Sequence, residues 1–533
     1  MKIRIEFLFL AGLPVYIWSG YGHDAQHTAL SWASSPSAQT LNQVHWSAPV
    51  DLNPGSTAGD LYIHYGSPAV TAANTVLLPV KTGVSDGFEV QARNGATGAL
   101  LYTLSTDYSL PAHVWVPPYG VVLSDRLTGS TPGRVSFFRE LIARAVERRP
   151  IPKSTERLYY AGAGGTVYYR DEVDSPTGPN GRPGATGQIA FYGNAAYAAN
   201  SAMFNSSVQI STPLTADSSG DVYFGFVVAG SNPANLTSGI ARISSDGTGT
   251  WMGAQALAGG DSSITQVALN CAPALSHDQT TLYVAVSNGS EFGAGYLAAA
   301  DSVTLAPLAH VQLMDPRGGL ATVSTDSSAS PMVGPDGDVY YGVLENNCCG
   351  SHNDRGWMLH FNAALTQAKI PGSFGWDDTA SVVPSNLVPS YSGASSYLIL
   401  VKYNNYAGIG TGTGVNKLAV LDPNAAQQDE YSVTPVQVMR EVLTITGVTP
   451  DPQGGPNAVW EWCINTAAID PLTKSALVNS EDGVVYRWDF TTNTFTQRLR
   501  LTAGRGEAYT PTLIGADGAV YAINDAVLFA VGN

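Results

Sequence analysis

The sequence is poor in charged residues, and basic residues are the scarcer kind. Charged side chains make up 13% of its 533 residues, with 26 lysines and arginines against 42 aspartates and glutamates, so the formal net charge is −16. Proteins that bind duplex nucleic acid or an anionic membrane surface need basic side chains to neutralise phosphates. The composition therefore argues against both partners. A cation or a neutral ligand such as a glycan is compatible with this charge, which also favours solubility.

Long amphipathic helices and long apolar runs are scarce too. The apolar run from Phe7 to about Trp18 follows Lys2 and Arg4 and is too short for a comfortable membrane span. A short apolar run after early positive charges resembles a secretory signal. We therefore expect residues 1–17 to be a signal-like segment, the protein to be secreted or periplasmic, and no transmembrane segment to follow.

Cysteine is rare. The four cysteines, Cys271, Cys348, Cys349 and Cys463, show no spacing typical of a zinc site. All four are disulfide candidates in an exported protein. The adjacent Cys348 and Cys349 can close a strained ring with each other. A bond from one of them to Cys271 or Cys463, or ordinary thiols, are equal alternatives.

The chain is rich in glycine, proline and tyrosine, with 56, 32 and 26 residues. They separate short runs of valine, threonine and serine that are typical of strands. A proline after a small residue, followed ten residues later by tyrosine or an aliphatic residue, recurs about every 60 residues, as at Pro213 with Tyr223 and at Pro331 with Tyr341. Such units begin near residues 68, 118, 213, 273, 331, 389, 467 and 511.

This period predicts an all-β fold, an eight-bladed β-propeller of four-stranded antiparallel blades, or a seven-bladed one if two short units merge. The last unit has room for three strands only, at residues 510–514, 519–523 and 527–531. We expect residues 44–52 to supply the fourth, since pairing the N-terminal strand with the last blade removes an exposed sheet edge. Residues 18–533 would then form a single domain, which we expect to be a monomer.

The second unit carries an insertion at about residues 126–157. Its predicted second strand is displaced to residues 157–160, and the inserted segment is basic and has a helical pattern. A basic amphipathic helix can contact a partner or a membrane. A surface excursion without a partner is the simpler interpretation.

Two segments resemble quinoprotein-like β-propellers. Residues 18–31 are similar to their frequent opening W-x-x-[F/Y]-G-x-D-x-x-H-T, and residues 92–102 to their blade motif A-x-D-x-x-T-G-x-x-x-W, with Asn94 for Asp and Tyr102 for Trp. The resemblance implies a propeller fold and raises the expectation of pyrroloquinoline quinone with calcium. Quinoprotein alcohol dehydrogenases hold an adjacent-cysteine ring against this cofactor, and residues 348–356 look similar to its surroundings.

In a propeller, the loops that join successive blades share one face with the loops between second and third strands, and ligands usually enter the central channel there. We call this side the channel face. It is predicted to carry acids suited to acid–base chemistry or calcium, and aromatic, histidine and arginine side chains suited to a sugar or a small ligand. The catalytic candidates are Asp377, Asp378 and Glu507, and the ligand-binding candidates are His64, His113, Trp115, Trp376, Arg355, Trp460 and Tyr509.

Each candidate has a structural alternative. Asp377 and Asp378 can cap turns, Glu507 can pair with Arg505, and the histidines and tryptophans can be packing groups. Three functions remain open: an exported propeller that binds a small molecule, a glycan or a protein at its channel face without chemistry; a quinone- and calcium-dependent oxidoreductase with Asp377 or Asp378 as base and Glu507 as metal ligand; and a glycan-active hydrolase or lyase that uses Asp377 and Glu507.

Overall fold

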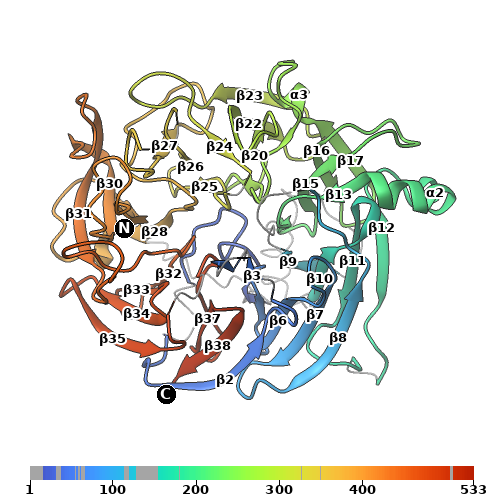
Figure 1. The fold of residues 1–533 in the computed structure, drawn as a ribbon. Coiled ribbons are helices and arrows are strands. Elements are labelled where there is room, and N and C mark those ends of the chain that lie inside the picture. Colours follow the sequence, from blue (N-terminus) through green and yellow to red (C-terminus); the bar gives the residue numbers. More distant parts are fainter. Residues whose placement is uncertain are drawn as a thin grey trace, which may run out of the picture.

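The computed structural model describes residues 16–31, 38–54, 56–57, 60–61, 66–112, 119–127, 154–178, 181–325, 327–347, 350–504 and 508–533. Eight antiparallel sheets stand in a ring, which confirms the predicted eight-bladed propeller (Figure 1). Middle strands are buried along their whole length, whereas an outermost strand such as β35 (Thr494–Arg500) alternates between exposed and half-buried residues. This is the pattern expected where each sheet packs against two neighbours and only its outer edge meets solvent. No helix among the described residues has the length and apolar character to cross a membrane.

The first four blades each have a broken or continuous inner strand and three further strands. Blade 1 contains β5 (Ala69–Thr71), β6 (Thr75–Lys81), β7 (Phe88–Asn94) and β8 (Leu100–Thr106), and blade 2 contains β9 (Val121–Leu127), β10 (Ser154–Ala161), β11 (Thr166–Asp171) and β12 (Thr186–Ala190). Blade 3 contains β13 (Val208–Ile210) and β14 (Thr215–Ala216), then β15 (Val222–Val228), β16 (Gly239–Ile243) and β17 (Gly249–Gly253). Blade 4 contains β18 (Gln266–Val267) and β19 (Ala274–Leu275), then β20 (Thr281–Ser287), β22 (Gly295–Asp301) and β23 (Pro307–Gln312).

The last four blades complete the ring. Blade 5 contains β25 (Met332–Val333), β26 (Val339–Val343) and β27 (Trp357–Phe361), and blade 6 contains β28 (Ser381–Pro384), β29 (Tyr397–Tyr403), β30 (Lys417–Gln428) and β31 (Gln437–Thr446). Blade 7 contains β32 (Ala468–Asp470), β33 (Ser475–Asn479), β34 (Val484–Asp489) and β35, and blade 8 contains β36 (Leu513–Ile514), β37 (Val520–Asn524), β38 (Val527–Gly532) and β2 (Gln43–Pro49).

Short elements lie between the blades. They are β1 (Tyr16–Trp18), β3 (Ser56–Thr57), β4 (Asp60–Leu61), β21 (Phe292–Gly293), β24 (Val323–Ser324), α2 (Asn194–Ser207), α3 (Ala254–Leu257), and the 3-10 turns η1 (Ala163–Gly165) and η2 (Ser385–Leu387). The α2 helix was not expected from the sequence. It has no apolar stripe, and Phe204 is its one fully buried large side chain.

The N-terminal strand closes the ring as predicted. In Figure 1 the blue β2 lies beside the red β38, and their pairing runs from Gln43 opposite Gly532 to Pro49 opposite Val527. Trp46 fixes this strand, since its ring packs against Tyr521 and its Nε1–H donates to the Gly95 carbonyl at 2.6 Å.

Two further predictions about single units can be compared with the strands. The displaced second strand of unit two is confirmed, because β10 pairs with β9 along its length; the inserted residues 128–153 lie outside the described residues. The start of unit six was wrong. Its inner strand β28 precedes Pro389, so the equivalent of the small residue and proline is Thr379-Ala380, as Thr466-Ala467 is in unit seven.

Blade 6 also reaches across to blade 5. The backbone N–H of Met439 on β31 donates to the Pro371 carbonyl, and Val436 and Val438 belong to the apolar core of blades 4 and 5. This hairpin of β30 and β31 brings Asp429 and Tyr431 next to the long loop of blade 5.

Candidate functional site at the channel face

Residues 16–31, which we call the plug, run inside the ring and contact the inner strands of seven blades. β1 pairs with β5 of blade 1, and the His27 ring lies 3.5 Å from Thr215 of blade 3. Ser19, Ala25, Gln26, Thr28 and Ala29 of the plug accept backbone hydrogen bonds from Leu123, Leu275, Val333, Val382 and Ile469 of blades 2, 4, 5, 6 and 7.

The quinoprotein-like opening motif is what shapes this plug. The Asp24 carboxylate accepts the backbone N–H groups of Gln26 and Thr28 and the Thr28 hydroxyl, and lies 3.2 Å from His23 Nδ1. Burial opposes ionisation of Asp24, but these hydrogen bonds outweigh it and lower its pKa. Gly22 has φ +61°, and a Cβ there would lie 2.8 Å from His27 Cβ, so the turn requires glycine. The motif is therefore structural here.

Tyr21 brings the plug to the channel face. Its hydroxyl lies 3.1 Å from the Ser328 carbonyl, 2.8 Å from Thr379 Oγ1 and 2.5 Å from Asn465 Oδ1. These three residues belong to the strand entries of blades 5, 6 and 7, so one phenol ties three blades together on the channel axis. Burial raises the pKa of Tyr21 far above its usual value, and the hydroxyl stays neutral.

Asp377 and Asp378, the predicted catalytic acids, have different surroundings. Asp377 Oδ1 accepts the backbone N–H of Ser328 at 2.5 Å and its hydroxyl at 2.6 Å, and Oδ2 lies 3.9 Å from Lys402 Nζ. Asp378 is 2% exposed, and its Oδ2 has no hydrogen-bond partner among the described residues. Burial raises the pKa of Asp378 well above its usual value, with the charge of Asp377 adding to the rise and Lys402 opposing it. Asp377 is thus a structural acceptor, whereas burial shifts Asp378 toward its protonated form.

A third acid extends this group, which we call the Lys402 cluster: Asp377, Asp378, Lys402 and Glu461. Burial raises the pKa of Glu461 to about 7, and Lys402 partly offsets the rise. Lys402 itself is 3% exposed at the end of β29. One buried ammonium thus lies 3.9 Å from Asp377 and acts electrostatically on Asp378 and Glu461.

Glu461 also belongs to a group that could hold a metal ion. The ligand atoms of Glu461, Cys463 and Glu481 all lie within 4.8 Å of one another, and this is the one such group of acids, histidines or cysteines found in the described part of the chain. Cys463 Sγ lies 3.7 Å from Glu481 Oε2. Cys463 and Cys271 are both buried thiols.

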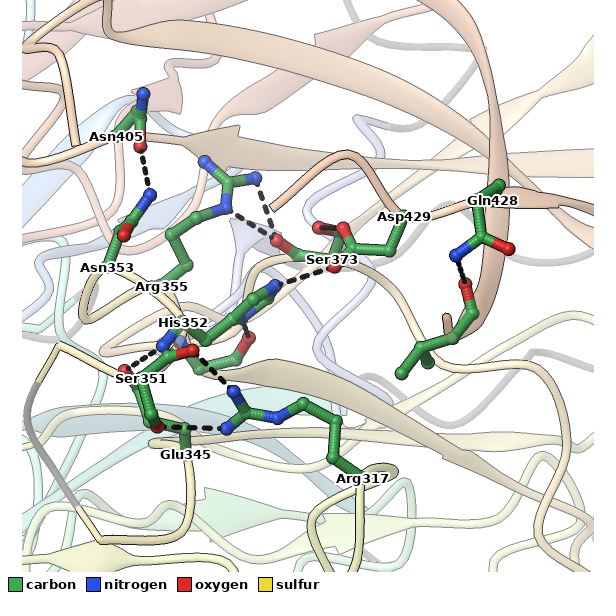
Figure 2. A network of polar contacts seen from close by, with 12 residues as sticks. Arg317, Glu345, Ser351, His352, Asn353, Arg355, Ser373, Asn405, Gln428 and Asp429 are labelled. Atoms are coloured by element: carbon green, nitrogen blue, oxygen red, sulfur yellow. Dashed lines mark hydrogen bonds and ion pairs between the residues drawn. The ribbon is translucent and has the colours of Figure 1, made fainter. Parts of the chain in front are cut away.

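The long loop of blade 5 is held by a second polar group, which we call the Asp429 network (Figure 2). His352 Nε2 lies 3.1 Å from Asp429 Oδ2, and the Ser373 hydroxyl donates to Asp429 Oδ1 at 2.5 Å. Glu345 accepts the backbone N–H groups of His352, Asp354 and Gly356. Both ring nitrogens of His352 and the carboxylate oxygens of Glu345 and Asp429 thus have hydrogen-bond partners.

Arg355, a predicted ligand-binding residue, is part of this network. It is fully buried, its Nε and Nη2 donate to the Ser373 carbonyl at 3.0 and 2.7 Å, and its Nη1 donates to the Asn404 carbonyl. Tyr431 and Tyr403 lie over the guanidinium at 3.7 and 4.2 Å. All three nitrogens are used inside the protein.

Three predicted aromatic residues lie at blade entries on the channel face and are half-buried. Trp376, Trp460 and Tyr509 are half-buried and stand on the segments that enter blades 6, 7 and 8. Trp376 packs against the core of blade 6. The other candidates, His64, His113, Trp115, Glu507, Cys348 and Cys349, lie outside the described residues.

The sequence pointed to Asp377, Asp378 and the aromatic residues but missed Lys402, Tyr21 and Glu481. Lys402 had a usable signal, because it is the one charged residue in the otherwise apolar or aromatic strand β29. Tyr21 had none, because its partners lie more than 300 residues away in sequence.

Comparison with known proteins gives the fold alone. No protein-family model and no curated protein matches the chain. Among solved structures it is similar to BamB from Moraxella catarrhalis, with 13% identity over 92% of this chain and 100% of that chain and a TM-score of 0.41. It is similar to the computationally designed Ika8 protein, with 10% identity over 93% and 100% and a TM-score of 0.40. It is also similar to the quinohemoprotein alcohol dehydrogenase ADHIIG from Pseudomonas putida HK5, with 13% identity over 97% and 76% and a TM-score of 0.47. The likeness to a quinoprotein-type propeller is thus one of fold.

Proposed function

We propose that this protein is an exported binding propeller that holds a neutral, polyhydroxylated ligand such as a glycan on its channel face. The observation that carries the proposal is the set of three half-buried aromatic side chains, Trp376, Trp460 and Tyr509, at three successive blade entries above a channel closed by the plug. A ligand then rests on the face instead of entering the axis.

The chemistry of this surface suits a sugar. Half-buried aromatic side chains can pack against the apolar side of a pyranose ring, while neighbouring polar groups bind its hydroxyls. Burial raises the pKa of Asp378, which favours its protonated form, and a protonated carboxyl can donate a hydrogen bond. The net charge of −16 repels anionic ligands and leaves neutral ones unaffected.

The described residues do not fit pyrroloquinoline quinone in the channel. A quinone placed between the entries of blades 5, 6 and 7 would have to displace Tyr21, whose hydroxyl contacts Ser328, Thr379 and Asn465 there. Asp377 is engaged by Ser328 and lies 3.9 Å from Lys402, whose charge disfavours a calcium ion at the same carboxylate. Reconstitution with the quinone and calcium should therefore give no dye reduction.

The test is a broad glycan array probed with the full chain, followed by calorimetric titration with the best-bound glycan. Trp376→Ala and Trp460→Ala should each weaken binding by about tenfold or more. Trp251→Ala is the matched control, because Trp251 is equally half-buried but stands on β17 at the outer edge of blade 3. An array without a binder, or equal losses in all three variants, would contradict the proposal; the first result would favour a protein partner instead.

A further inference from the structure

We propose that Glu461, Cys463 and Glu481 form a binding site for a thiophilic divalent cation of the zinc type at the channel face of blade 7. Their ligand atoms lie within 4.8 Å of one another, a spacing that one ion can bridge. The ligands are a thiol and two carboxyl groups from two separate segments. Nothing in the proposed recognition of a glycan requires this site.

Packing fixes the two segments that carry the ligands. Glu461 and Cys463 flank Trp462, which is 1% exposed and packs against Tyr486 and Phe495 at ring distances of 5.6 and 5.7 Å. The residues on either side of this anchored indole are thereby fixed, and their ligand atoms lie within 4.8 Å of each other.

Glu481 comes from the turn between β33 and β34 and is brought to the same place by its neighbour. The Ser480 hydroxyl donates to the Glu461 carbonyl at 3.4 Å, and Cys463 Sγ lies 3.7 Å from Glu481 Oε2. The donor set is thus positioned by the core of blade 7 and by contacts between its two loops, before any ion binds.

Asp378, at the entry to blade 6, is a further buried carboxyl that the charge of Lys402 affects together with Glu461. It is 2% exposed, and its Oδ2 has no hydrogen-bond partner among the described residues. An unpartnered buried carboxyl oxygen is costly. The metal site itself rests on the spacing of Glu461, Cys463 and Glu481.

The donor set selects the ion. Sulfur ligands favour zinc and its heavier analogue cadmium, whereas calcium and magnesium take oxygen alone. On binding, the Cys463 S–H bond breaks, its proton goes to solvent, and the sulfur electron pair forms the bond to the metal, with no oxidation or reduction. Three protein ligands leave a position for water or for a ligand atom.

Cadmium is the probe, since a cadmium–thiolate bond produces an ultraviolet charge-transfer band. The full chain, reduced and carrying Cys348→Ala and Cys349→Ala to remove two further thiols, should bind one equivalent of Cd²⁺ and show the band. Cys463→Ser should abolish the band and weaken Cd²⁺ affinity about tenfold or more. Cys271→Ala, which removes a buried thiol in blade 4, should change neither.

Glu481→Gln keeps the shape of the side chain and serves if Cys463→Ser does not fold. It should retain the band and weaken Cd²⁺ affinity about tenfold. Zn²⁺ should displace Cd²⁺ from the parent chain. Absence of the band in the parent, or unchanged affinity in folded Cys463→Ser or Glu481→Gln, would overturn the proposal.

Discussion

Two buried polar groups lie on the channel face within blades 5 to 7, and they differ in how completely their hydrogen bonds are made. In the Asp429 network, His352, Asp429, Glu345 and Arg355 have a partner at each described polar atom. In the Lys402 cluster, Asp378 Oδ2 has none, and burial raises the pKa of both Asp378 and Glu461. Satisfied networks rigidify a structure, whereas unsatisfied acids mark a place where binding a ligand gains free energy.

Asp429→Ala should have the largest effect, because it leaves the buried His352 and Ser373 without their acceptor. Loss of one partner in such a buried group costs about 3–5 kcal/mol of unfolding free energy. Urea unfolding at neutral pH measures it. A loss below about 1 kcal/mol would show that the network does not stabilise the fold.

The same carboxylate predicts a pH dependence. Burial raises the pKa of Asp429, but the hydrogen bond and charge of His352 outweigh it, so the folded pKa is lowered. Its contribution is therefore present above the usual pKa of 3.8 and lost as the pH falls below it. The difference in stability between the parent and Asp429→Asn should shrink on acidification below pH 4.

Arg355→Lys should cause the second-largest loss of stability. A lysine keeps the charge but cannot donate to both the Ser373 and Asn404 carbonyls in the plane between Tyr403 and Tyr431. We expect a loss of about 2–3 kcal/mol in unfolding free energy with the same fold. If Arg355→Lys binds the ligand of the channel face less well at unchanged stability, Arg355 acts in binding and not in the network.

Asp378→Asn, in contrast to Asp429→Ala and Arg355→Lys, should not destabilise the fold at high pH. The folded pKa of Asp378 is raised, so the ionised carboxyl destabilises the fold, and stability is lost as the pH rises toward that pKa. The asparagine has no charge to lose. The variant should be at least as stable as the parent at pH 8, and the two should converge below about pH 4, near the usual pKa of an aspartate, as followed by thermal unfolding. A large loss at every pH would place Asp378 with the structural acids.

Asp354→Asn should show the smallest effect and marks the edge of the Asp429 network. Burial and the charge of Glu345 raise the pKa of Asp354 to about 6, while its bond from the Gly350 N–H is one that asparagine can keep. Since the group is about half exposed, its ionisation costs about 1 kcal/mol or less. The variant should gain that amount in urea unfolding at pH 8, and the gain should shrink toward zero below about pH 4. An equal gain at both pH values would exclude ionisation as its cause.

The fold could be predicted from the sequence because the sequence contains a clear repeat. A proline, a turn and a tyrosine at fixed spacing report strand entry, hairpin and buried second strand, and these are local properties. The closing strand was predicted for the same reason, because the last unit visibly lacked one. Unit six was misplaced since Pro389 stands at the usual distance from Ile399 but follows η2, a turn that the pattern does not distinguish from a strand entry.

The candidate site was harder to predict, because its contacts join residues that lie far apart in the sequence. Asp377 and Asp378 stood out as adjacent acids on a predicted loop. Ser328 donates hydrogen bonds to Asp377, whereas Asp378 Oδ2 receives none from the described residues. This difference depends on how blade 5 packs against blade 6. For the plug, the sequence indicates only a family motif at the start of the domain. No residue pattern predicts that this N-terminal segment turns inward and contacts the inner strands of seven blades.

The plug and β2 also have a consequence for biosynthesis. Residues 16–31 and 43–49 are synthesised long before their partners at Ile469 and at 527–532. The ring therefore cannot close until residues 527–532 have been synthesised, and the early blades keep an open edge until then. Contacts of such long sequence separation fold slowly and expose strand edges meanwhile. Pairing of those edges with other chains then competes with folding, until β2 meets β38.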